Sequence, residues 1–559
     1  MKLTGAQILI KTLIEQGVTD VFGYPGGQVI NIYDALYEYR NEINHVLTAH
    51  EQGASHAADG YSRATGKVGV CIATSGPGAT NLVTGIATAM LDSIPLVAIT
   101  GNVPCSLIGK DSFQEIDITG VMLPITKHNY FVNRIEDLAD TVREAFSIAK
   151  SGRPGPVLID IPKDVQVATY EYEEKPVVPK IPLPTVSEAL VEQAAAMIAE
   201  AKRPYIYIGG GAAGLGMGEE IVAFAEKIDA VIGCSFMGLS AVPQESERFL
   251  GMQGMHGHYA SSMAQNEADL ILAVGVRFSD RATGNVAKFA KKSKIIQLDP
   301  DQAEVNKNVR VDLGLVGDVE DAFKRIAAKC QKADNPAWIL RVRELKSEEQ
   351  TFEEEIAAAN TAALTPKQVF DIVNAEKPAA TVITTDVGQH QMWTAQYLKF
   401  DRPRRWVSSG GLGTMGFGLG AAMGAYVATK DPTVLITGDG SFGMNLNELA
   451  TAVTYKIPVV IVLMNNGVLG MVRQWQTLFF GKRYSNTVLE RKTDFVALAK
   501  AFGAEGYLAE TPVEFKQAFV KALKAGKPVV IDTRIDKDEF VLPMLPPGGA
   551  IDDIITKVK

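Results

Sequence analysis

The chain has 559 residues, with 55 Lys and Arg against 64 Asp and Glu and a formal net charge of −9. This length predicts about three or four domains. The acidic balance, without a basic block, excludes a nucleic-acid-binding surface, and no run approaches the ~20 apolar residues of a membrane span. The scattered cysteines lack metal-ligand spacing and are typical of a reducing compartment. We therefore expect a cytoplasmic protein with neither a nucleic-acid nor a membrane partner.

The first 165 residues alternate short apolar runs with helical patterns. Strands that alternate with helices in this way predict an open, doubly wound parallel sheet. Thr4 is expected to cap the first helix. Five runs have the composition of buried strands: residues 20–22, 46–48, 69–73, 96–100 and 157–160.

Glu51 follows one of these strands and starts a helix, residues 49–66, that is rich in Ala, Ser and Gly. Small residues let another helix approach closely, so we expect this helix to pack at a subunit interface. A first-turn glutamate is often only a partner of the helix dipole. The alternative is a carboxylate in an apolar cleft that exchanges a proton with a heterocycle.

Four other residues among the first 165 lie near strand ends or in loops. Phe113 and Gln114 lie in a loop, and Arg153 and Lys163 flank the strand at 157–160. Taken singly, the polar residues fit a solvated surface and Phe113 fits a core.

Four prolines between residues 175 and 187 exclude a helix interior or a central strand and predict an extended tether between domains. A second Rossmann-like sheet follows, with strands expected at 205–208, 270–276 and 295–298. The glycines after the first of these strands and the acid after the third suit a dinucleotide, although the spacing is not GxGxxG. These residues are Gly209, Gly210, Gly211 and Asp299.

His256 and His258 are close in sequence but have no third metal ligand nearby, so a structural or substrate-facing role is favoured over a metal site. Residues 347–360 are acidic and helix-favouring, and are expected to form a solvated helix on a second linker.

Residues 433–466 predict a β-α-β unit with its helix over residues 444–456. Asp439 follows the first strand, and Asn465 and Asn466 follow the second. Carboxyl ends of parallel strands share one crevice, where carboxylate and amide oxygens suit Mg²⁺ and a helix N-terminus suits a diphosphate. Two ordinary strand-end turns remain the alternative.

Three more features surround this unit. Gln389 and His390 follow another strand and are possible diphosphate donors, and Met415 lies in a glycine-rich entry to a helix. Trp475 and Phe479 lie four residues apart, so they could line one helix face over the crevice or pack into the core.

The combination of HEQGA with GDG and a later NN resembles the thiamine diphosphate decarboxylase superfamily. Within that superfamily, one family matches along nearly the whole chain, namely the catalytic subunits of acetohydroxyacid synthase (acetolactate synthase). The motifs that carry this resemblance are HEQGASHAADGYSRATGKVGV, SGPGATN, DSFQEID, RFSDRATG, DVGQHQMW, GTMGFGLGAAMGA and LGMVRQWQ.

The resemblance implies three α/β domains with doubly wound, Rossmann-like parallel sheets. They are a pyrimidine-binding domain at 1–165, an FAD domain at 188–335, and a diphosphate- and Mg²⁺-binding domain at 365–540, followed by a tail at 541–559. It also implies a homodimer or a dimer of dimers with thiamine diphosphate between subunits, a structural FAD, and a small regulatory subunit as possible partner.

The resemblance assigns roles to single residues. Glu51 is expected to bind the pyrimidine N1′, Met415 to bend the cofactor, and Asp439, Asn466 and the Val468 carbonyl to hold Mg²⁺. Diphosphate contacts are expected from Gln389, His390, Gly440 and Ser441. FAD contacts are expected from Arg153, Gly209, Gly210, Gly211, His256, Arg277, Asp299 and Asp318.

The implied reaction decarboxylates pyruvate and condenses the hydroxyethyl carbanion with a second 2-ketoacid, pyruvate or 2-ketobutyrate. Arg281 is expected to hold the acceptor carboxylate, and Trp475 to shape its pocket. Phe113, Gln114 and Lys163 are expected to line the substrate channel. The rivals are a pyruvate oxidase that uses thiamine diphosphate and FAD, and a non-catalytic flavoprotein or assembly subunit of the same fold.

Overall fold

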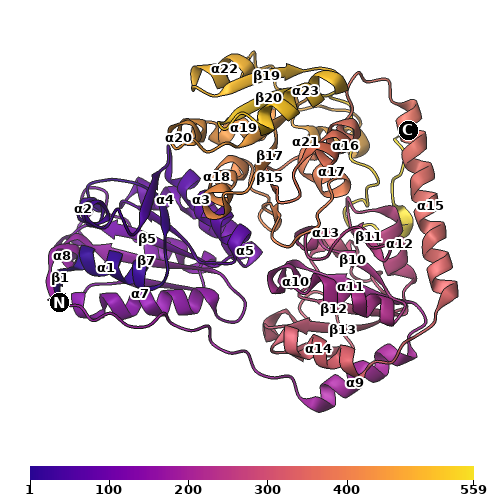
Figure 1. The fold of residues 1–559 in the computed structure, drawn as a ribbon, viewed down its shortest axis with the longest axis horizontal. Coiled ribbons are helices and arrows are strands. Elements are labelled where there is room, and N and C mark those ends of the chain that lie inside the picture. Colours follow the sequence, from indigo (N-terminus) through magenta and orange to yellow (C-terminus); the bar gives the residue numbers. More distant parts are fainter. Residues whose placement is uncertain (559) are drawn as a thin grey trace.

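The computed structural model describes residues 1–558, apart from the side chain of Ala359. The described residues form three parallel sheets, as predicted, with six strands in each, and one small antiparallel pair of β1 (Lys2–Thr4) with β8 (Thr169–Glu171). Figure 1 shows the N-terminal domain on one side of the molecule, with the middle and C-terminal domains stacked on the other. No helix in this described part is both long and apolar enough to cross a membrane.

The N-terminal sheet has the order β3-β2-β4-β5-β7-β6. Its strands are β2 (Asp20–Tyr24), β3 (Asn44–Leu47), β4 (Gly69–Ala73), β5 (Leu96–Asn102), β6 (His128–Phe131) and β7 (Pro156–Pro162). Its helices are α1 (Gly5–Glu15), α2 (Ile30–Glu38), α3 (Glu51–Thr65), α4 (Pro77–Asn81), α5 (Val83–Asp92), η1 (Cys105–Leu107), α6 (Ile118–Met122), η2 (Leu123–Ile125), α7 (Ile135–Lys150) and α8 (Lys163–Val167). Thr4 caps α1 in a capping box with Gln7, as predicted.

The middle sheet has the order β11-β10-β9-β12-β13-β14. Its strands are β9 (Pro204–Ile208), β10 (Val231–Cys234), β11 (Phe249–Met252), β12 (Leu270–Val274), β13 (Lys294–Asp299) and β14 (Leu313–Val316). Its helices are α9 (Glu188–Glu200), α10 (Gly210–Leu215), α11 (Gly218–Lys227), η3 (Phe236–Gly238), α12 (Tyr259–Glu267), α13 (Asp280–Thr283), η4 (Gln302–Glu304) and α14 (Val319–Lys329). Numbered by appearance, the order is 3-2-1-4-5-6, which is the dinucleotide-binding order.

The C-terminal sheet has the order β16-β15-β17-β18-β20-β19. Its strands are β15 (Val382–Thr385), β16 (Trp406–Val407), β17 (Thr433–Gly438), β18 (Val460–Asn465), β19 (Glu505–Ala509) and β20 (Val529–Arg534). Its helices are α16 (Pro366–Glu376), α17 (Gln389–Tyr397), α18 (Phe417–Thr429), α19 (Asp439–Asn445), α20 (Glu448–Thr454), α21 (Gly470–Phe479), α22 (Phe495–Ala501) and α23 (Pro512–Leu523), with η5 (Ile551–Asp553) in the tail. The predicted single helix at 444–456 is wrong, because a helix starts directly at Asp439 and a second one follows a break at 446–447.

Helices α3 and α18 pack against each other along small residues. A Cβ on Gly424 would lie 1.8 Å from the Ala57 carbonyl oxygen, and one on Gly60 would lie 2.1 Å from that of Ala421. The backbones therefore touch, which only glycine permits. The expectation that α3 meets another subunit through its small residues is wrong for this face, because its partner is α18 of the same chain.

Two connections join the domains. Residues 172–187 are extended, as predicted, and lead from β8 to α9. The second connection is α15 (Pro336–Ala359), which runs along one side of the middle and C-terminal domains. The expected solvated helix at 347–360 is only its second half, and Trp338, Val342 and Leu345 bury the first half against the middle domain.

Candidate active site

The C-terminal sheet places Asp439 and the 386–390 segment at one crevice. Strands β15 and β17 are neighbours, but the chain leaves β15 toward β16 and leaves β17 toward β18. This is the topological switch point, outside which ligands bind in open α/β sheets. Asp439 follows β17, and Gln389 and His390 begin α17 just after β15, so the sheet brings the predicted residues together.

The predicted metal ligands lie around this crevice. Asp439 is 7% exposed, and burial raises its pKa to about 6. Asn466 follows β18, donates from Nδ2 to Gln389 Oε1 at 3.2 Å, and accepts from the Val468 N–H at 3.2 Å. Asn466 therefore ties the 466–468 turn, with its Val468 carbonyl, to the start of α17.

Groups suited to an anion line the same edge. His390 is buried, which lowers its pKa to about 3, so it is neutral in the physiological range. Its Nε2 has no hydrogen-bond partner among the described residues. Ser441 donates its hydroxyl to the Val387 carbonyl at 2.7 Å. Gly440 lies in the first turn of α19, where the backbone N–H groups have no partner within the helix.

Met415 faces this region, and the predicted pocket residue Trp475 lies on α21. A Cβ on Gly440 would lie 3.8 Å from Met415 Cε, so the methionine reaches the crevice. Trp475 is half-buried on α21, 6.0 Å from the ring of Phe479 in an edge-to-face pair. Phe479 is 41% exposed, so these rings line a helix face rather than the core.

Glu51 begins α3 in the N-terminal domain and is half-buried. Asn81 donates from Nδ2 to Glu51 Oε2 at 2.9 Å, and a Cβ on Gly78 would lie 3.2 Å from Glu51 Oε1. Glu448 of the C-terminal domain accepts from the Ala49 and His50 N–H groups at 3.1 and 3.0 Å. The start of α3 is therefore fixed by both domains.

The other N-terminal candidates gather at the same sheet edge. Lys163 Nζ donates to the Gly27 carbonyl at 3.2 Å, and a Cβ on Gly76 would lie 3.0 Å from Gln114 Cβ. Phe113 is 85% exposed, so the interpretation of this ring as a core residue is wrong.

Phe417, which starts α18 two residues after Met415, packs against α3 at two places. The guanidinium of Arg63, in the last turn of α3, lies 5.2 Å from the ring centroid of Phe417, the first residue of α18. The same ring lies 5.2 Å from the ring of His56, five residues after Glu51, in an edge-to-face pair. The segment that carries Met415 therefore enters α18 directly against α3.

The middle sheet has its own switch point between β9 and β12. A Cβ on Gly209 would lie 2.1 Å from the Gly275 carbonyl oxygen, so the two strand ends touch by backbone. Within the described residues, His256 Nδ1, Gln297 Oε1 and Glu304 Oε2 are buried without hydrogen-bond partners. Buried polar atoms without hydrogen-bond partners near such a crevice suit the binding of a polar ligand.

The remaining middle-domain candidates have mixed surroundings. Arg277 is half-buried and its pKa is lowered by burial, while burial raises the pKa of Asp299 to about 6. Asp318 caps α14 by accepting from the Asp321 N–H at 3.1 Å. Arg281 is exposed beside Asp280.

Arg153 joins the N-terminal domain to the middle domain. Its Nη1 lies 2.5 Å from Glu304 Oε1, and its Nε donates to Ser93 Oγ at 2.7 Å. The interpretation of this arginine as a free surface charge is therefore wrong, because it pairs with a buried carboxylate of another domain.

Asp386 is a functional candidate that sequence reasoning missed. It is buried at the end of β15 and accepts from the Gly416 N–H at 2.7 Å and the Thr437 hydroxyl at 3.0 Å. Its position directly after a strand, the signal that drew attention to Asp439, also applies here.

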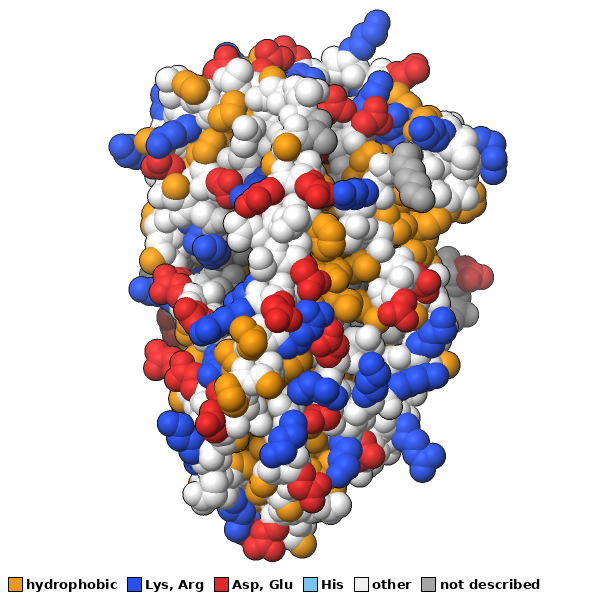
Figure 2. Space-filling model, turned by 90° about the vertical axis from the view of Figure 1, so that its right-hand side faces the viewer, with side chains coloured by type: hydrophobic (Ala, Val, Ile, Leu, Met, Phe, Trp, Pro, Cys, Tyr) orange, Lys and Arg blue, Asp and Glu red, His pale blue; other side chains and the backbone are white. Residues whose placement is uncertain are grey.

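A separate cavity of about 230 Å³ lies between α15, α16, α17 and the chain near residue 540. Figure 2 faces this side, where hydrophobic side chains are exposed between charged ones. Three side chains at its edge bring potential metal-ligand atoms within 4.8 Å of one another: His258, Glu349 and Glu353. His258 Nδ1 is 2.8 Å from Glu349 Oε1, which also caps α12, so this group serves as an internal ion pair.

Comparisons with known proteins identify the chain. The thiamine pyrophosphate enzyme models match with the N-terminal TPP binding domain at residues 3–121, the central domain at 191–326 and the C-terminal TPP binding domain at 386–533. The probable acetolactate synthase large subunit of Methanocaldococcus jannaschii is 45% identical and aligns with 100% of this chain and 96% of its own length. The acetolactate synthase isozyme 2 large subunit of Escherichia coli is 45% identical over 100% of both chains. This chain belongs to the acetolactate synthase large subunit family.

The acetolactate synthase family match agrees with the two crevices. The TPP-binding models cover the N-terminal and C-terminal sheets, which carry Glu51 and Asp439. The buried Asp439 carboxylate suits a divalent cation, and the unpartnered His390 Nε2 suits an anionic oxygen. At the middle sheet, the unpartnered atoms and the glycine contact suit a dinucleotide.

Proposed function

We propose that this chain catalyses acetolactate synthesis, joining the two-carbon fragment of pyruvate to a second 2-ketoacid with release of CO₂. The full-length similarity to acetolactate synthase large subunits carries this proposal, with Glu51, Asp439 and Asn466 all present in TPP-binding domains. Thiamine diphosphate supplies the electron sink for the decarboxylation.

The C-terminal crevice holds the charged end of the cofactor in this proposal. Asp439, Asn466 and the Val468 carbonyl bind Mg²⁺ through oxygen atoms, the ligands this cation prefers. The diphosphate is bound by Gln389, His390, Gly440 and Ser441. The first turn of α19 adds N–H groups and the positive end of its dipole.

Glu51 acts on the pyrimidine ring and holds its proton at N1′. The glutamate that faces one Met415 comes from a second copy of the chain in this proposal, which follows the resemblance to enzymes that hold thiamine diphosphate between subunits. A homodimer is therefore the smallest active unit. Apolar residues exposed on the single chain near these segments, such as Phe113 and Leu412, suit burial in such a dimer.

The substrate region is assigned to residues around the two crevices. Arg281 is exposed, and its surface pair with Asp280 at 3.5 Å can give way to a pairing of its planar guanidinium with a carboxylate of the acceptor. Trp475 bounds the pocket for the acceptor side chain, and Phe113, Gln114 and Lys163 line the approach.

The middle domain binds FAD in a structural role. Gly209, Gly210 and Gly211 accept the pyrophosphate by close backbone approach. Asp299 ends β13, and Asp318 follows the neighbouring strand β14. The other proposed FAD contacts come from Arg153, His256 and Arg277. The relatives are named large subunits, so we also expect a small regulatory subunit as partner.

Purified protein with thiamine diphosphate, Mg²⁺, FAD and pyruvate tests the activity. Acetolactate, measured as acetoin after acid decarboxylation, is the expected product. Acetate with reduced flavin and no acetoin would instead establish a pyruvate oxidase, the second candidate function. No product in either assay would reject both.

A further inference from the structure

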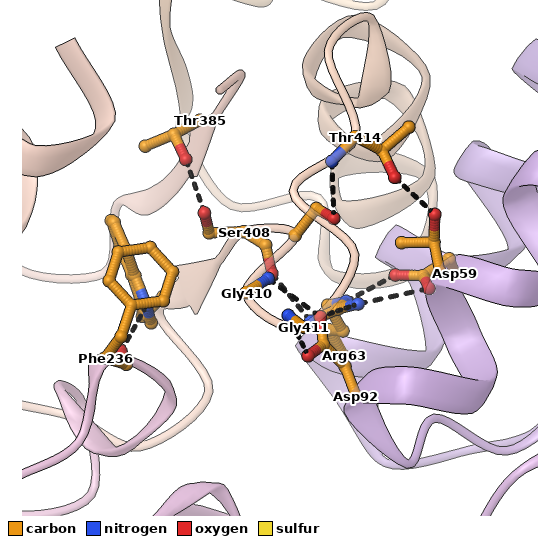
Figure 3. Close-up of polar contacts among 12 residues, drawn as sticks. Asp59, Arg63, Asp92, Phe236, Thr385, Ser408, Gly410, Gly411 and Thr414 are labelled. Carbon is orange, nitrogen blue, oxygen red and sulfur yellow. Dashed lines mark hydrogen bonds and ion pairs between the residues drawn. The ribbon is translucent and has the colours of Figure 1, made fainter. Parts of the chain in front are cut away.

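The segment at 408–416, which leads into α18, is fixed by the N-terminal domain as well as by its own. Arg63 Nη1 donates to the Ser408 carbonyl at 2.7 Å, and the hydroxyls of Thr88 and Thr414 are 2.7 Å apart. Figure 3 shows these contacts reaching the segment from α3 and α5. Met415 therefore lies next to a residue that another domain holds.

Asp92, the last residue of α5, makes the strongest of these contacts. Its carboxylate accepts from the Gly410 N–H at 2.9 Å and the Gly411 N–H at 2.7 Å, and Arg63 Nη2 lies 3.0 Å away. The Asp92 side chain has no exposed area. Hydrogen bonds to a buried charged group are shorter and stronger than neutral ones.

The charges in this cluster explain why the segment must stay in place. Asp59 and Asp92 are both buried, and Arg63 contacts both, so two carboxylates share one guanidinium. The Gly410 and Gly411 N–H groups compensate the remaining negative charge. Displacement of the segment would leave a buried carboxylate with too few partners, which is costly.

On the other side, Asp386 accepts from the Gly416 N–H. Thr414 and Gly416 are thus held from two different domains, and Met415 is the single residue between them. Leu412 and Gly413 are exposed on the outer side of the segment.

We infer that Asp92 is a positioning residue for the cofactor, holding the 408–416 segment so that Met415 stands at the Asp439 crevice. This inference rests on the proposed function, since it assumes that thiamine diphosphate binds beside Met415. Arg63 and Thr88 act with Asp92, and none of the three contacts the crevice itself.

Asp92→Asn tests the inference. The amide keeps the size of the side chain but places an N–H₂ donor among three donors, so at least one bond to the segment is lost. We expect the Kd for thiamine diphosphate with Mg²⁺, measured by calorimetry, to rise about 10- to 100-fold. Hydrogen exchange of residues 408–416 should become faster. Thr88→Val, which removes one neutral bond, should raise Kd about 2- to 10-fold and guards against misfolding of the first variant.

Glu15→Gln is the matched control. Glu15 pairs with Arg143 at 2.6 and 2.8 Å, both side chains are buried, and the pair lies between α1 and α7 of the same domain. This variant should lose stability but keep Kd within about twofold.

An unchanged Kd and unchanged exchange in Asp92→Asn and Thr88→Val would overturn the positioning role. An equal rise in Glu15→Gln would also overturn it, because the effect would then be general destabilisation. If the wild-type protein binds no thiamine diphosphate, the proposed function fails and the inference falls with it. The wild-type measurement therefore separates the two failures.

Discussion

The N-terminal and C-terminal domains share one topology and differ in their chemistry. Numbered by appearance within each domain, both sheets have the order 2-1-3-4-6-5, whereas the middle sheet has 3-2-1-4-5-6. Helix α3 follows the second strand of its sheet and α18 follows the second strand of the other. These equivalent helices are the ones that pack on each other, so the two domains face each other through the same element.

The difference lies in the residues at equivalent strand ends. In the N-terminal domain, the connection after the second strand leads to the acid Glu51 at the start of α3. The same connection in the C-terminal domain carries the apolar Met415 just before α18. After the third strand, β4 leads to the neutral turn at Ser75 and Gly76, while β17 leads to Asp439. In the proposed function, one scaffold thus serves a heterocycle on one side and a cation with its anion on the other, because function resides in the site rather than in the fold.

Of the changes that test the difference between the two domains, Glu51→Gln should have the largest effect. We expect acetolactate formation to fall about 10²- to 10⁴-fold, the range for loss of a general acid or base. Binding of thiamine diphosphate should persist, because the diphosphate half of the site lies in the other domain. Exchange of the cofactor C2 proton, followed by NMR, measures the affected step.

Glu136→Gln is the control for this variant. Glu136 is also a first-turn glutamate of the N-terminal domain, on α7, and is exposed. It interacts with its helix dipole but has no place in the site, so activity should not change. Normal C2-proton exchange in Glu51→Gln would show that Glu51 is only a dipole partner as well.

Gly424→Ala tests the helix contact that relates the two domains. Its Cβ would meet the Ala57 carbonyl oxygen at 1.8 Å, and backbone cannot move aside without separating α3 from α18. Overpacking of this kind lowers the free energy of unfolding by about 1–3 kcal/mol. Urea denaturation should therefore shift to a lower midpoint.

Gly27→Ala should leave the urea midpoint nearly unchanged, since a Cβ there would meet no atom of the described residues within 4 Å, apart from its two chain neighbours. Equal midpoints for Gly424→Ala, Gly27→Ala and the wild type would mean that the α3 and α18 contact is loose in solution.

The sequence predicted the central strands better than the edges. The first domain was expected to have five strands, and the missing one, β6, is an edge strand with half-exposed residues. β11, β14, β16 and β19 were also missed, and each lies at an edge. Edge strands are buried on fewer sides, so their sequences lack the continuous apolar runs that mark central parallel strands. The remaining misses are β10, a short interior strand of four residues, and the three-residue strands β1 and β8 of the small antiparallel pair.

The candidate site was predictable where a residue follows a strand, because strand ends converge at one edge of a sheet. Asp439, Asn466 and Gln389 follow this rule. Contacts between domains have no such local signal: Asp92 and Arg63 reach a segment more than 300 residues away. The partner of α3 and the pairing of Arg153 with Glu304 could not be read from the sequence for the same reason.

The middle domain differs from the other two in that a titratable pair fastens it to α15. His258 Nδ1 lies 2.8 Å from Glu349 Oε1, and Glu349 also accepts from the Tyr259 and Ala260 N–H groups at 3.2 and 3.1 Å. Burial opposes the charge on His258, but the Glu349 carboxylate outweighs it and raises the histidine pKa above 6.5.

A histidine whose pKa is raised on folding stabilises the folded state below its unfolded pKa of about 6.5, and this stabilisation is lost as pH rises through the folded value. Glu349→Gln should therefore lower the free energy of unfolding by about 1 kcal/mol more at pH 6 than at pH 9. Urea denaturation at both pH values measures the difference. Glu267→Gln removes a neighbouring pair between α12 and α15, at 2.9 Å from Arg341, whose guanidinium stays charged throughout. Its effect should be the same at both pH values, and a pH-independent effect of Glu349→Gln as well would mean that His258 stays neutral in the folded protein.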